Sequence, residues 1–536
     1  MFDPKKVLTK LTLKEKVGQL FFRTSYQMRT EISDELLTLF DKGVLGNVIL
    51  FAGTNIQGVE QCRELTNKLQ EIAQDSQHKI PLFIGIDQEG GQLSPIFRGC
   101  EVFPGNMNLG VVNDYALTKK VGRFLGNQVS LAGGNMNFCP VLDVAYDAKF
   151  GTPIIDNRTL SSDPNIVANL GCALIEGIAQ TNVLACAKHF PGQRLVLRDT
   201  HHELDIIDYS MERLEKVELL PFKKAIAAKI PALMTHHCIY KALDDLPATL
   251  SSKVTNYLRK QLGFQGLIVS DDLCMDAITD QFGTENAMIK SINAGINLLI
   301  MTDHHSWNSE FVIDAVKKGI IDINTINDSV YRILGYKSRL KSAENHENNI
   351  KQTIVSGLNR KAEKKTALAV ARRSIVQYGT DLKPNFALKN KRVSVILGNP
   401  IRLVMSDTVN RYQISLREEI RSKGYADEVH ELVLPLEPNE MEVLSFAHEF
   451  FMAEVVIYCT CNAFHWQQQL KPLDIRWPEK DQKVIGVALR SPEDAKLLQT
   501  RCDQVFITGG ITPLTIQALV ETIFGDNKAV NNSQFN

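Results

Sequence analysis

The sequence lacks long hydrophobic runs, an excess of basic residues and paired-cysteine motifs, and each absence excludes a class of protein. No stretch approaches the ~20 uninterrupted apolar residues that a membrane span requires. Charges run through the N-terminal MFDPKKVLTKLTLKEKVGQLFF, which leaves no apolar segment long enough for a secretory signal. The 60 Lys and Arg residues are balanced by 61 Asp and Glu residues, which argues against binding to a nucleic-acid backbone. We therefore expect a cytoplasmic protein with no membrane or nucleic-acid partner.

The ten cysteines are scattered, and none forms a C-x-x-C pair. Four lie in or beside apolar strand-like runs: Cys139, Cys186, Cys238 and Cys274. This distribution is typical of reduced, buried thiols. Cys459 and Cys461 alternate as in a strand, but two thiols without nearby histidines are too few for a metal site. Residues 391–526 also lack a phosphate-loop pattern and a G-x-G-x-x-G motif.

A chain of 536 residues is too long for one ordinary domain, and its first 300 residues repeat a strand-then-helix pattern. Eight short apolar runs predict strands: Val17–Phe22, Val44–Ala52, Leu82–Asp87, Met136–Val144, Val183–Phe190, Ala232–Tyr240, Leu267–Asp272 and Ile296–Thr302. Stretches with helical spacing lie between them, so the strands should be parallel and buried on both faces. Eight such units predict an α/β fold, a (β/α)8 barrel of the TIM type. An open, doubly wound sheet is the alternative.

A second, smaller α/β sandwich domain follows a charged, helical stretch. Its predicted strands are Arg392–Gly398, Glu454–Cys461, Lys483–Leu489 and Asp503–Thr508. Four strands with intervening helices indicate a small parallel sheet covered on both faces. The predicted organisation is therefore a catalytic barrel over 1–345, a helical linker over 346–390, the second α/β domain over 391–526 and a flexible tail over 527–536.

Polar residues gather where the predicted barrel strands end. They are Asp87-Gln88-Glu89-Gly90-Gly91, Asp143, Lys188-His189, His236-His237 and Asp271-Asp272. The carboxyl ends of barrel strands open on one face, where the loops build active sites. Five polar strand ends on one rim favour a functional site over a set of unrelated turn caps.

Three motifs offer chemistry, although each by itself also fits a structural role. In Lys188-His189-Phe190-Pro191-Gly192, a cation and an imidazole precede a turn and can donate hydrogen bonds to sugar hydroxyls. Asp199 and His201, two residues apart in the next loop, can form a pair in which the carboxylate orients the imidazole as a general acid. Asp271 follows a buried strand and can serve as a nucleophile. A capped strand end, a charged surface loop and a capped turn are the respective structural alternatives.

The joint occurrence of these motifs, in this order, resembles glycoside hydrolase family 3, specifically its β-N-acetylglucosaminidase branch. The residues that carry the resemblance are Asp87–Gly91, Asn137–Asp143, Asn157–Pro164, Lys188–Gly192, Pro247–Ser251, Leu262–Phe264 and Ser270–Leu273. The resemblance covers roughly residues 10–340. Residues 390–536 are similar, more weakly, to the second domain of two-domain members, notably at Val487–Pro492 and Leu519–Gly525.

The resemblance implies a retaining hydrolase in which Asp271 is the nucleophile. It also implies that His201, paired with Asp199 in a D-[ST]-H pattern, is the general acid and base. Substrate-holding roles carry over to four further residues: Asp87, Arg158, Lys188 and His189. The family requires no metal or cofactor, and we expect a monomer whose partner is a small carbohydrate, an N-acetylglucosaminide.

The sequence departs from the family pattern in two places. The usual K-H-F-P-G-H-G-x-T continues here as Gln193-Arg194-Leu195-Val196, and the usual Gly-Gly-Arg reads Gly90-Gly91-Gln92, with Arg98 as a candidate replacement for the missing cation. The leading hypothesis is a β-N-acetylglucosaminidase acting on cell-wall muropeptides in peptidoglycan recycling. The alternatives are a β-glucosidase-like enzyme or β-glycoside phosphorylase with the same covalent intermediate, and a sugar-binding paralogue without activity.

Overall fold

The computed structural model describes residues 2–25, 28–145, 156–193, 204–303, 309–340, 358–379, 388–399, 407–408, 412–475 and 482–531. Within these ranges, eight parallel strands close into a barrel in the order β1-β10-β9-β7-β5-β4-β3-β2. The strands are β1 (Phe21–Arg23), β2 (Asn47–Leu50), β3 (Phe83–Ile86), β4 (Met136–Asn137), β5 (Leu184–Phe190), β7 (Ala232–Thr235), β9 (Leu267–Asp272) and β10 (Leu298–Met301). The barrel prediction is confirmed, and the open-sheet alternative is excluded.

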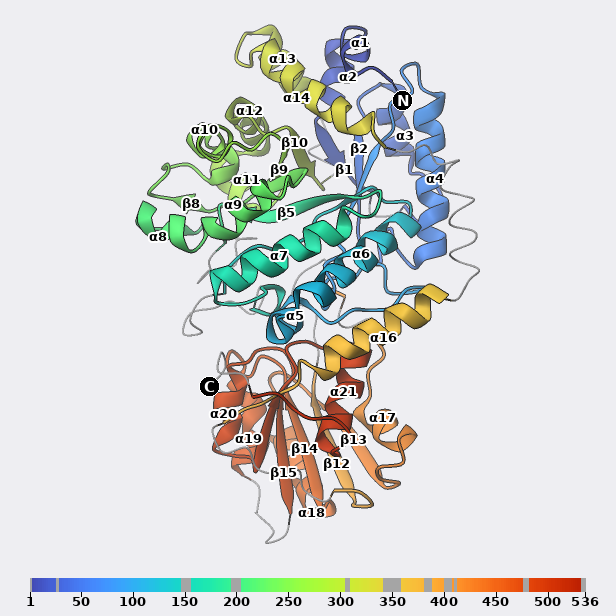
Figure 1. The fold of residues 1–536 in the computed structure, drawn as a ribbon, viewed down its shortest axis with the longest axis vertical. Coiled ribbons are helices and arrows are strands. Elements are labelled where there is room, and N and C mark those ends of the chain that lie inside the picture. Colours follow the sequence, from blue (N-terminus) through green and yellow to red (C-terminus); the bar gives the residue numbers. More distant parts are fainter. Residues whose placement is uncertain are drawn as a thin grey trace.

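Helices surround the barrel, as Figure 1 shows. They are α1 (Pro4–Leu8), α2 (Leu13–Gly18), α3 (Asp34–Asp41), α4 (Val59–Asp75), α5 (Asn106–Val112), α6 (Tyr115–Leu131), α7 (Pro164–Ile178), α8 (Met211–Lys216), α9 (Leu219–Ala227), α10 (Ser252–Asn256), α11 (Asp276–Phe282), α12 (Thr284–Ala294), α13 (Glu310–Lys317) and α14 (Ile323–Lys337). The closest pair, α6 and α7, meets at two glycines. A Cβ at Gly177 would lie 2.1 Å from the carbonyl oxygen of Lys119, so only glycine permits this approach.

Two predicted strands need correction. Val17 and Gly18 belong to helix α2, because Thr12 and Glu15 form a capping box that starts a helix immediately before β1. The run predicted as one strand over Ala232–Tyr240 is divided: β7 ends at Thr235, and β8 (Ile239–Tyr240) pairs instead with β6 (Ile206–Ile207).

The second domain contains a sheet of six described strands in the order β11-β16-β15-β14-β12-β13. Its strands are β11 (Val376–Gln377), β12 (Val393–Gly398), β13 (Val429–Leu434), β14 (Val455–Thr460), β15 (Lys483–Ala488) and β16 (Gln504–Ile507). All neighbouring pairs are parallel except β11 with β16. The α/β prediction for this half is confirmed, although the sequence analysis missed β11 and β13. Strand β13 lies at the sheet edge, where the polar residues His430 and Glu431 interrupt the apolar pattern.

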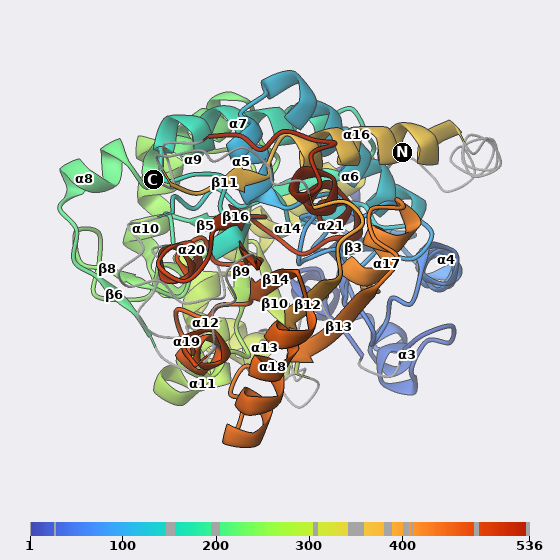
Figure 2. The same cartoon turned by 90° about the horizontal axis from the view of Figure 1, so that it is seen from below.

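Helices cover both faces of this sheet. They are α16 (Leu358–Arg372), α17 (Leu416–Ser422), α18 (Glu440–Met452), α19 (Lys471–Asp474), α20 (Asp494–Gln499) and α21 (Pro513–Ile523). Figure 2 shows α16, α17 and α21 on one side and α18, α19 and α20 on the other. Alternate residues of the strands pack into two separate apolar clusters, one on each face. The cluster under α16 and α21 continues into barrel helices α6 and α7, so the two domains share a hydrophobic interface.

The predicted domain boundaries remain predictions, but two observations bear on them. Strand β11, within the predicted linker 346–390, belongs to the second sheet. Val530, within the predicted tail, donates its N–H to Ile375 and accepts one from Gln377, which ties this part of the tail to β11.

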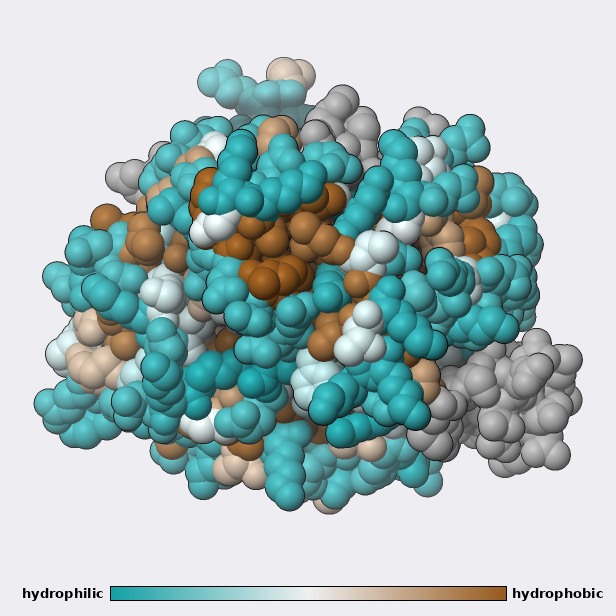
Figure 3. Space-filling view, turned by 90° about the horizontal axis from the view of Figure 1, so that it is seen from above, coloured by the Kyte–Doolittle hydropathy of each residue, from teal (hydrophilic) through white to brown (hydrophobic). Residues whose placement is uncertain are grey.

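The end of the barrel that lies away from the second domain carries an apolar area on its surface, visible in Figure 3. Among the large hydrophobic side chains of α13, α14 and their connection, Phe311, Ile320, Ile323 and Tyr331 are exposed. Of the described helices, none combines the length and apolar character needed to cross a bilayer.

Candidate active site

Five strands deliver charged or imidazole side chains to one rim of the barrel. Asp87 and Glu89 follow β3, Asp143 follows β4, Lys188 and His189 lie at the end of β5, His236 and His237 follow β7, and Asp271 and Asp272 end β9. Arg158 joins them from a short 3₁₀ turn, Asp156–Arg158. The sequence expectation that these strand ends share one face follows from the parallel barrel.

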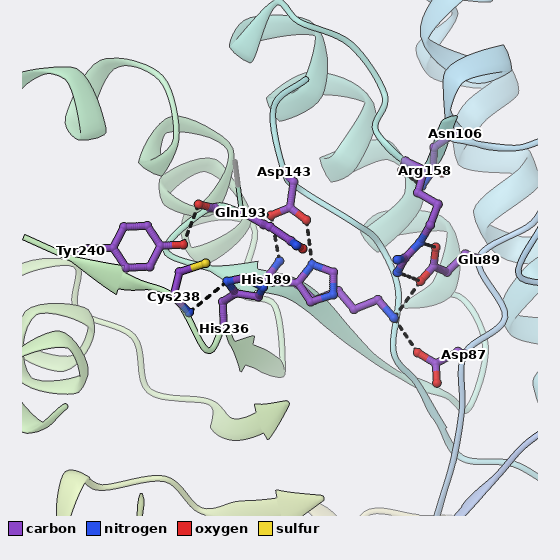
Figure 4. Close-up of polar contacts among 12 residues, drawn as sticks. Asp87, Glu89, Asn106, Asp143, Arg158, His189, Gln193, His236, Cys238 and Tyr240 are labelled. Atoms are coloured by element: carbon purple, nitrogen blue, oxygen red, sulfur yellow. Dashed lines mark hydrogen bonds and ion pairs between the residues drawn. The ribbon is translucent and has the colours of Figure 1, made fainter. Parts of the chain in front are cut away.

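The first group on the rim is a buried cluster of two carboxylates and two cations (Figure 4). The Lys188 Nζ lies 2.5 Å from Asp87 Oδ1 and 2.7 Å from Glu89 Oε1. Arg158 binds Glu89 in a bidentate manner: Nε donates to Oε2 at 3.1 Å and a terminal nitrogen donates to Oε1 at 2.9 Å. Side-chain exposure is 3% for Lys188 and 2% for Glu89, but 14% for Asp87. Glu89 thus forms the inner part of this ion cluster, and Asp87 is its more accessible carboxylate.

Opposite charges keep the inner members of the ion cluster ionised. Burial would raise the pKa of Glu89, but Arg158 and Lys188 lower it to about 2. Burial would likewise lower the pKa of Lys188, and Asp87 and Glu89 instead raise it. A charged, rigid and nearly dry set of donors and acceptors is suited to hold polar hydroxyl groups in one orientation.

The second group is a histidine held by a buried carboxylate. His189 Nδ1 lies 2.7 Å from Asp143 Oδ2, while Asp143 Oδ1 accepts the backbone N–H groups of His189 at 3.1 Å and Gln193 at 2.7 Å. Burial would raise the pKa of Asp143, but His189 and these hydrogen bonds lower it overall. An ionised Asp143 accepts the Nδ1 proton, which fixes the tautomer and leaves Nε2 as the second functional nitrogen of His189.

A second imidazole stands beside the first. The rings of His189 and His236 are 5.6 Å apart and nearly perpendicular. His236 Nδ1 accepts the backbone N–H of Cys238 at 3.2 Å, and burial, with His189 nearby, lowers the pKa of His236 to about 3. His236 is therefore neutral near pH 7.

The two adjacent carboxylates at the end of β9 have different environments. Asp272 accepts the backbone N–H groups of Cys274 at 3.1 Å and Thr302 at 3.3 Å, together with the Thr302 hydroxyl, and so holds the turn after the strand. Burial raises the pKa of Asp272. Burial would do the same to Asp271, but the charges of His237 and His189, foremost among the neighbours, lower the pKa of Asp271 overall. Asp271 is thus an ionised carboxylate beside the imidazoles, available for attack on an electrophile.

The structure brings together five of the seven residues that the sequence analysis selected. Asp87, Arg158 and Lys188 form the ion cluster, and His189 and Asp271 are electrostatic neighbours. Asp199 and His201 lie outside the described residues. The described residues next to them are well anchored: Gly192 accepts a hydrogen bond of 2.7 Å from the Tyr240 hydroxyl, and Ile206 pairs with Ile239.

Three further residues belong to this site although the sequence analysis assigned them no role: Glu89, Asp143 and His236. The sequence did contain a signal for them, because all three lie in or directly after predicted strands and were grouped with the polar strand ends. The proposed replacement by Arg98 was wrong. Arg98 is exposed, with its guanidinium 5.5 Å from the ring of Phe97, whereas Gln92 is buried and accepts a hydrogen bond from Arg490 of the second domain.

Two further properties of the described residues bear on metal and disulfide chemistry. No group of three or more His, Cys, Asp or Glu side chains in them could hold a metal ion. No disulfide joins the ten cysteines, all of which lie in the described ranges.

Comparisons with known proteins agree with this geometry. The family model described as the glycosyl hydrolase family 3 N-terminal domain matches residues 12–335. Beta-hexosaminidase A of Pseudoalteromonas piscicida is 33% identical over 368 residues, which are 63% of this chain and 61% of that relative. Beta-hexosaminidase of Nitrosomonas eutropha is 33% identical over 265 residues, 48% of this chain and 74% of the relative.

A solved structure resembles the whole chain. The family 3 β-N-acetylglucosaminidase from Paenibacillus sp. str. FPU-7 has a TM-score of 0.87 at 29% identity, covering 97% of this chain and 98% of its own. The predicted family, enzyme class and two-domain architecture are confirmed by these comparisons together.

Proposed function

Because the chain belongs to glycosyl hydrolase family 3, a family of glycoside-cleaving enzymes, we propose that it removes terminal, non-reducing β-N-acetylglucosamine residues with retention of configuration. The observation that carries the proposal is the rim itself, where the ion cluster and an ionised Asp271 stand at the ends of barrel strands, with His189 next to Lys188 in the chain and an electrostatic neighbour of Asp271. The named activities of the relatives support the choice of sugar.

The proposed reaction has two steps. Asp271 attacks the anomeric carbon and the bond to the leaving oxygen breaks, while His201 donates a proton to that oxygen. A covalent glycosyl-enzyme results. His201 then takes a proton from water, which attacks the same carbon and releases the sugar and the Asp271 carboxylate. Asp199 orients the imidazole and raises its pKa, so that it can donate a proton near neutral pH.

The substrate-holding roles follow from the chemistry of each side chain. Asp87 can accept hydroxyl hydrogen bonds, and its exposure makes it the accessible carboxylate of the ion cluster. Lys188, Arg158 and His189 can donate to hydroxyl or amide oxygens. Glu89 holds Lys188 and Arg158 in place for that task.

We propose that the sugar comes from muropeptides of peptidoglycan and that the enzyme works in the cytoplasm as a monomer. The resemblance of the sequence to the β-N-acetylglucosaminidase branch, which has members that recycle peptidoglycan fragments, supports the substrate. The absence of disulfides among the described cysteines agrees with a reducing compartment.

Turnover of nitrophenyl β-N-acetylglucosaminide beside nitrophenyl β-glucoside, with and without phosphate, tests the sugar and the acceptor. We expect hydrolysis of the N-acetylglucosaminide to be much faster and independent of phosphate. Preference for the glucoside would contradict the sugar assignment, and a sugar phosphate product would contradict hydrolysis. Asp271→Ala should abolish turnover, while the matched control Asp272→Asn should be far milder, since Asp272 holds a turn.

A leaving-group comparison tests the general acid. His201→Ala should slow a natural disaccharide much more than a nitrophenyl glycoside, because nitrophenolate departs with little protonation. His202→Ala is the matched control in the same loop. Equal losses on both substrates in His201→Ala would remove His201 from the acid role, and a leaving-group-dependent loss in His202→Ala would transfer that role to the neighbour.

A further inference from the structure

The second domain turns the carboxyl edge of its sheet toward the barrel rim. Thr508, which follows β16, accepts a hydrogen bond of 2.7 Å from the side chain of Asn108 in barrel helix α5. Arg490, which follows β15, reaches Gln92 in the loop after β3. Along the chain, β13 is added on one side of β12, and β14, β15 and β16 are then added on the other side. The change of side, between β12 and β14, is the position at which doubly wound sheets usually bind ligands. In this protein, the residues that follow β15 and β16 contact the barrel.

Arg490 is a buried cation at this junction. Its side chain is 1% exposed, and a terminal nitrogen lies 2.8 Å from Oδ2 of Asp407, which is fully buried. The same nitrogen donates to the side-chain oxygen of Gln92. A buried guanidinium requires a paired carboxylate, and Asp407 supplies it from the second domain. Both members of the ion pair thus belong to the second domain, and Arg490 also donates a hydrogen bond to Gln92 of the barrel.

Two further residues of the second domain form hydrogen bonds with the backbone of the barrel loop that contains Gln92. Thr408 donates its N–H to the carbonyl oxygen of Gln92 at 2.7 Å and its hydroxyl to the same oxygen at 2.8 Å. The Tyr412 hydroxyl donates to the carbonyl oxygen of Gly91 at 2.6 Å. The carbonyl oxygens of Gly91 and Gln92 therefore both accept hydrogen bonds from the second domain.

The inner side of that loop carries Glu89. Residues 89–93 form a tight turn in which the backbone N–H groups of Glu89 and Gly90 both donate to the Leu93 carbonyl, at 2.9 and 3.2 Å. The side chain of Glu89 then binds Lys188 and Arg158. A shift of this turn would therefore move the carboxylate that fixes both cations, and site geometry is sensitive to displacements of about 1 Å.

We propose that Arg490 is a positioning residue for the sugar site: through Gln92 it fixes the turn that carries Glu89, and the ion cluster of the barrel depends on the second domain. This inference rests on the proposed function for its substrate. The inference also explains why position 92 is glutamine here. The family pattern has an arginine of the barrel at this position, whereas in this protein Arg490 of the second domain brings a buried guanidinium to it.

The test compares Arg490→Met with a matched control, Arg372→Met. Arg372 makes an ion pair with Glu521 of α21, inside the second domain, and its side chain is 44% exposed. With nitrophenyl β-N-acetylglucosaminide, Arg490→Met should raise KM and lower kcat/KM at least tenfold, whereas Arg372→Met should change kcat/KM less than twofold. The exchange Gln92→Arg with Arg490→Gln, which keeps a guanidinium beside Asp407, should recover most of the lost kcat/KM.

Two results would overturn the inference: a kcat/KM within twofold of wild type for Arg490→Met, or an equal loss in both arginine variants. If Arg490→Met does not fold, Gln92→Leu removes the acceptor from the barrel side and leaves the Arg490–Asp407 pair intact. The same rise in KM is expected there, and an unchanged KM refutes the inference. A wild-type protein that hydrolyses no glycoside defeats the proposed function instead. Calorimetric Kd values of wild type and Arg490→Met for N-acetylglucosamine then decide the role of Arg490.

Discussion

Replacing Glu89 by Gln removes the central negative charge of the ion cluster while keeping the shape of the side chain. Lys188 and Arg158 then face a neutral amide, and Lys188 retains Asp87 as its carboxylate partner. The variant should lose both stability and activity, because the two buried cations lose part of their compensation and their fixed orientation.

The size of the stability loss follows from the pKa of Glu89, which falls from 4.5 to about 2 in the folded protein. At roughly 1.4 kcal/mol per pKa unit, this corresponds to about 3.5 kcal/mol in favour of the ionised form. An unfolding entropy of about 2.1 cal/mol/K per residue over roughly 330 barrel residues is about 0.7 kcal/mol/K, so Tm should fall by about 5 °C.

The pH dependence has a defined sign. Since the folded pKa lies below the unfolded one, the stabilisation is present above about pH 4.5 and is lost as the pH falls toward 2. The Tm difference between wild type and Glu89→Gln should therefore be full at pH 7 and less than half as large at pH 3. Calorimetric scans at both values measure it.

Asp87→Asn is the matched control, because Asp87 is the more exposed carboxylate and has Lys188 as its partner. We expect it to lower kcat/KM at least tenfold with a smaller fall in Tm than Glu89→Gln, since Lys188 keeps Glu89 as a carboxylate partner and the Glu89–Arg158 pair stays intact. Glu89→Gln should lower kcat/KM at least as much and also lower Tm. A Glu89→Gln protein with wild-type Tm at pH 7 would refute the assignment of Glu89 as the inner anchor of the ion cluster.

Three other changes have expected outcomes. Lys188→Ala should lower kcat/KM at least tenfold, because hydrogen bonds from a charged donor contribute about 1.5–3 kcal/mol; steady-state kinetics measure it. Burial raises the pKa of Glu363 to about 7, so this group stabilises the protein below about pH 4.5 and loses that effect as the pH rises through 7. Glu363→Gln should therefore have a higher Tm than wild type at pH 8, and almost no advantage at pH 4. Burial lowers the pKa of Lys337, whose Nζ donates to Gln19 and to the Gly46 carbonyl, so wild-type stability rises with pH toward 10. Lys337→Met should raise Tm at pH 7, and the gain should shrink by pH 10.

Local pattern in the sequence determined the barrel and most of its rim. Apolar runs with helical stretches between them specify parallel strands, and the residues at the C-terminal end of each run must then reach the carboxyl rim, as Asp87, Lys188 and Asp271 do. The sequence did not predict β11 and β13, because β13 has polar residues within its apolar pattern and β11 has two residues. Their identity depends on neighbours that lie far away in the chain.

The tertiary structure alone decided how the charges pair and which residues meet across the domains. Asp271 and Asp272 are adjacent in the sequence, yet one holds a turn and the other is ionised beside imidazoles, because burial and neighbouring charge set the state of a carboxylate. Glu89 meets Arg158 across 69 positions, and Gln92 meets Arg490 across 398. No local pattern encodes such contacts, since they exist only once the chain has closed the barrel and packed the second domain against it.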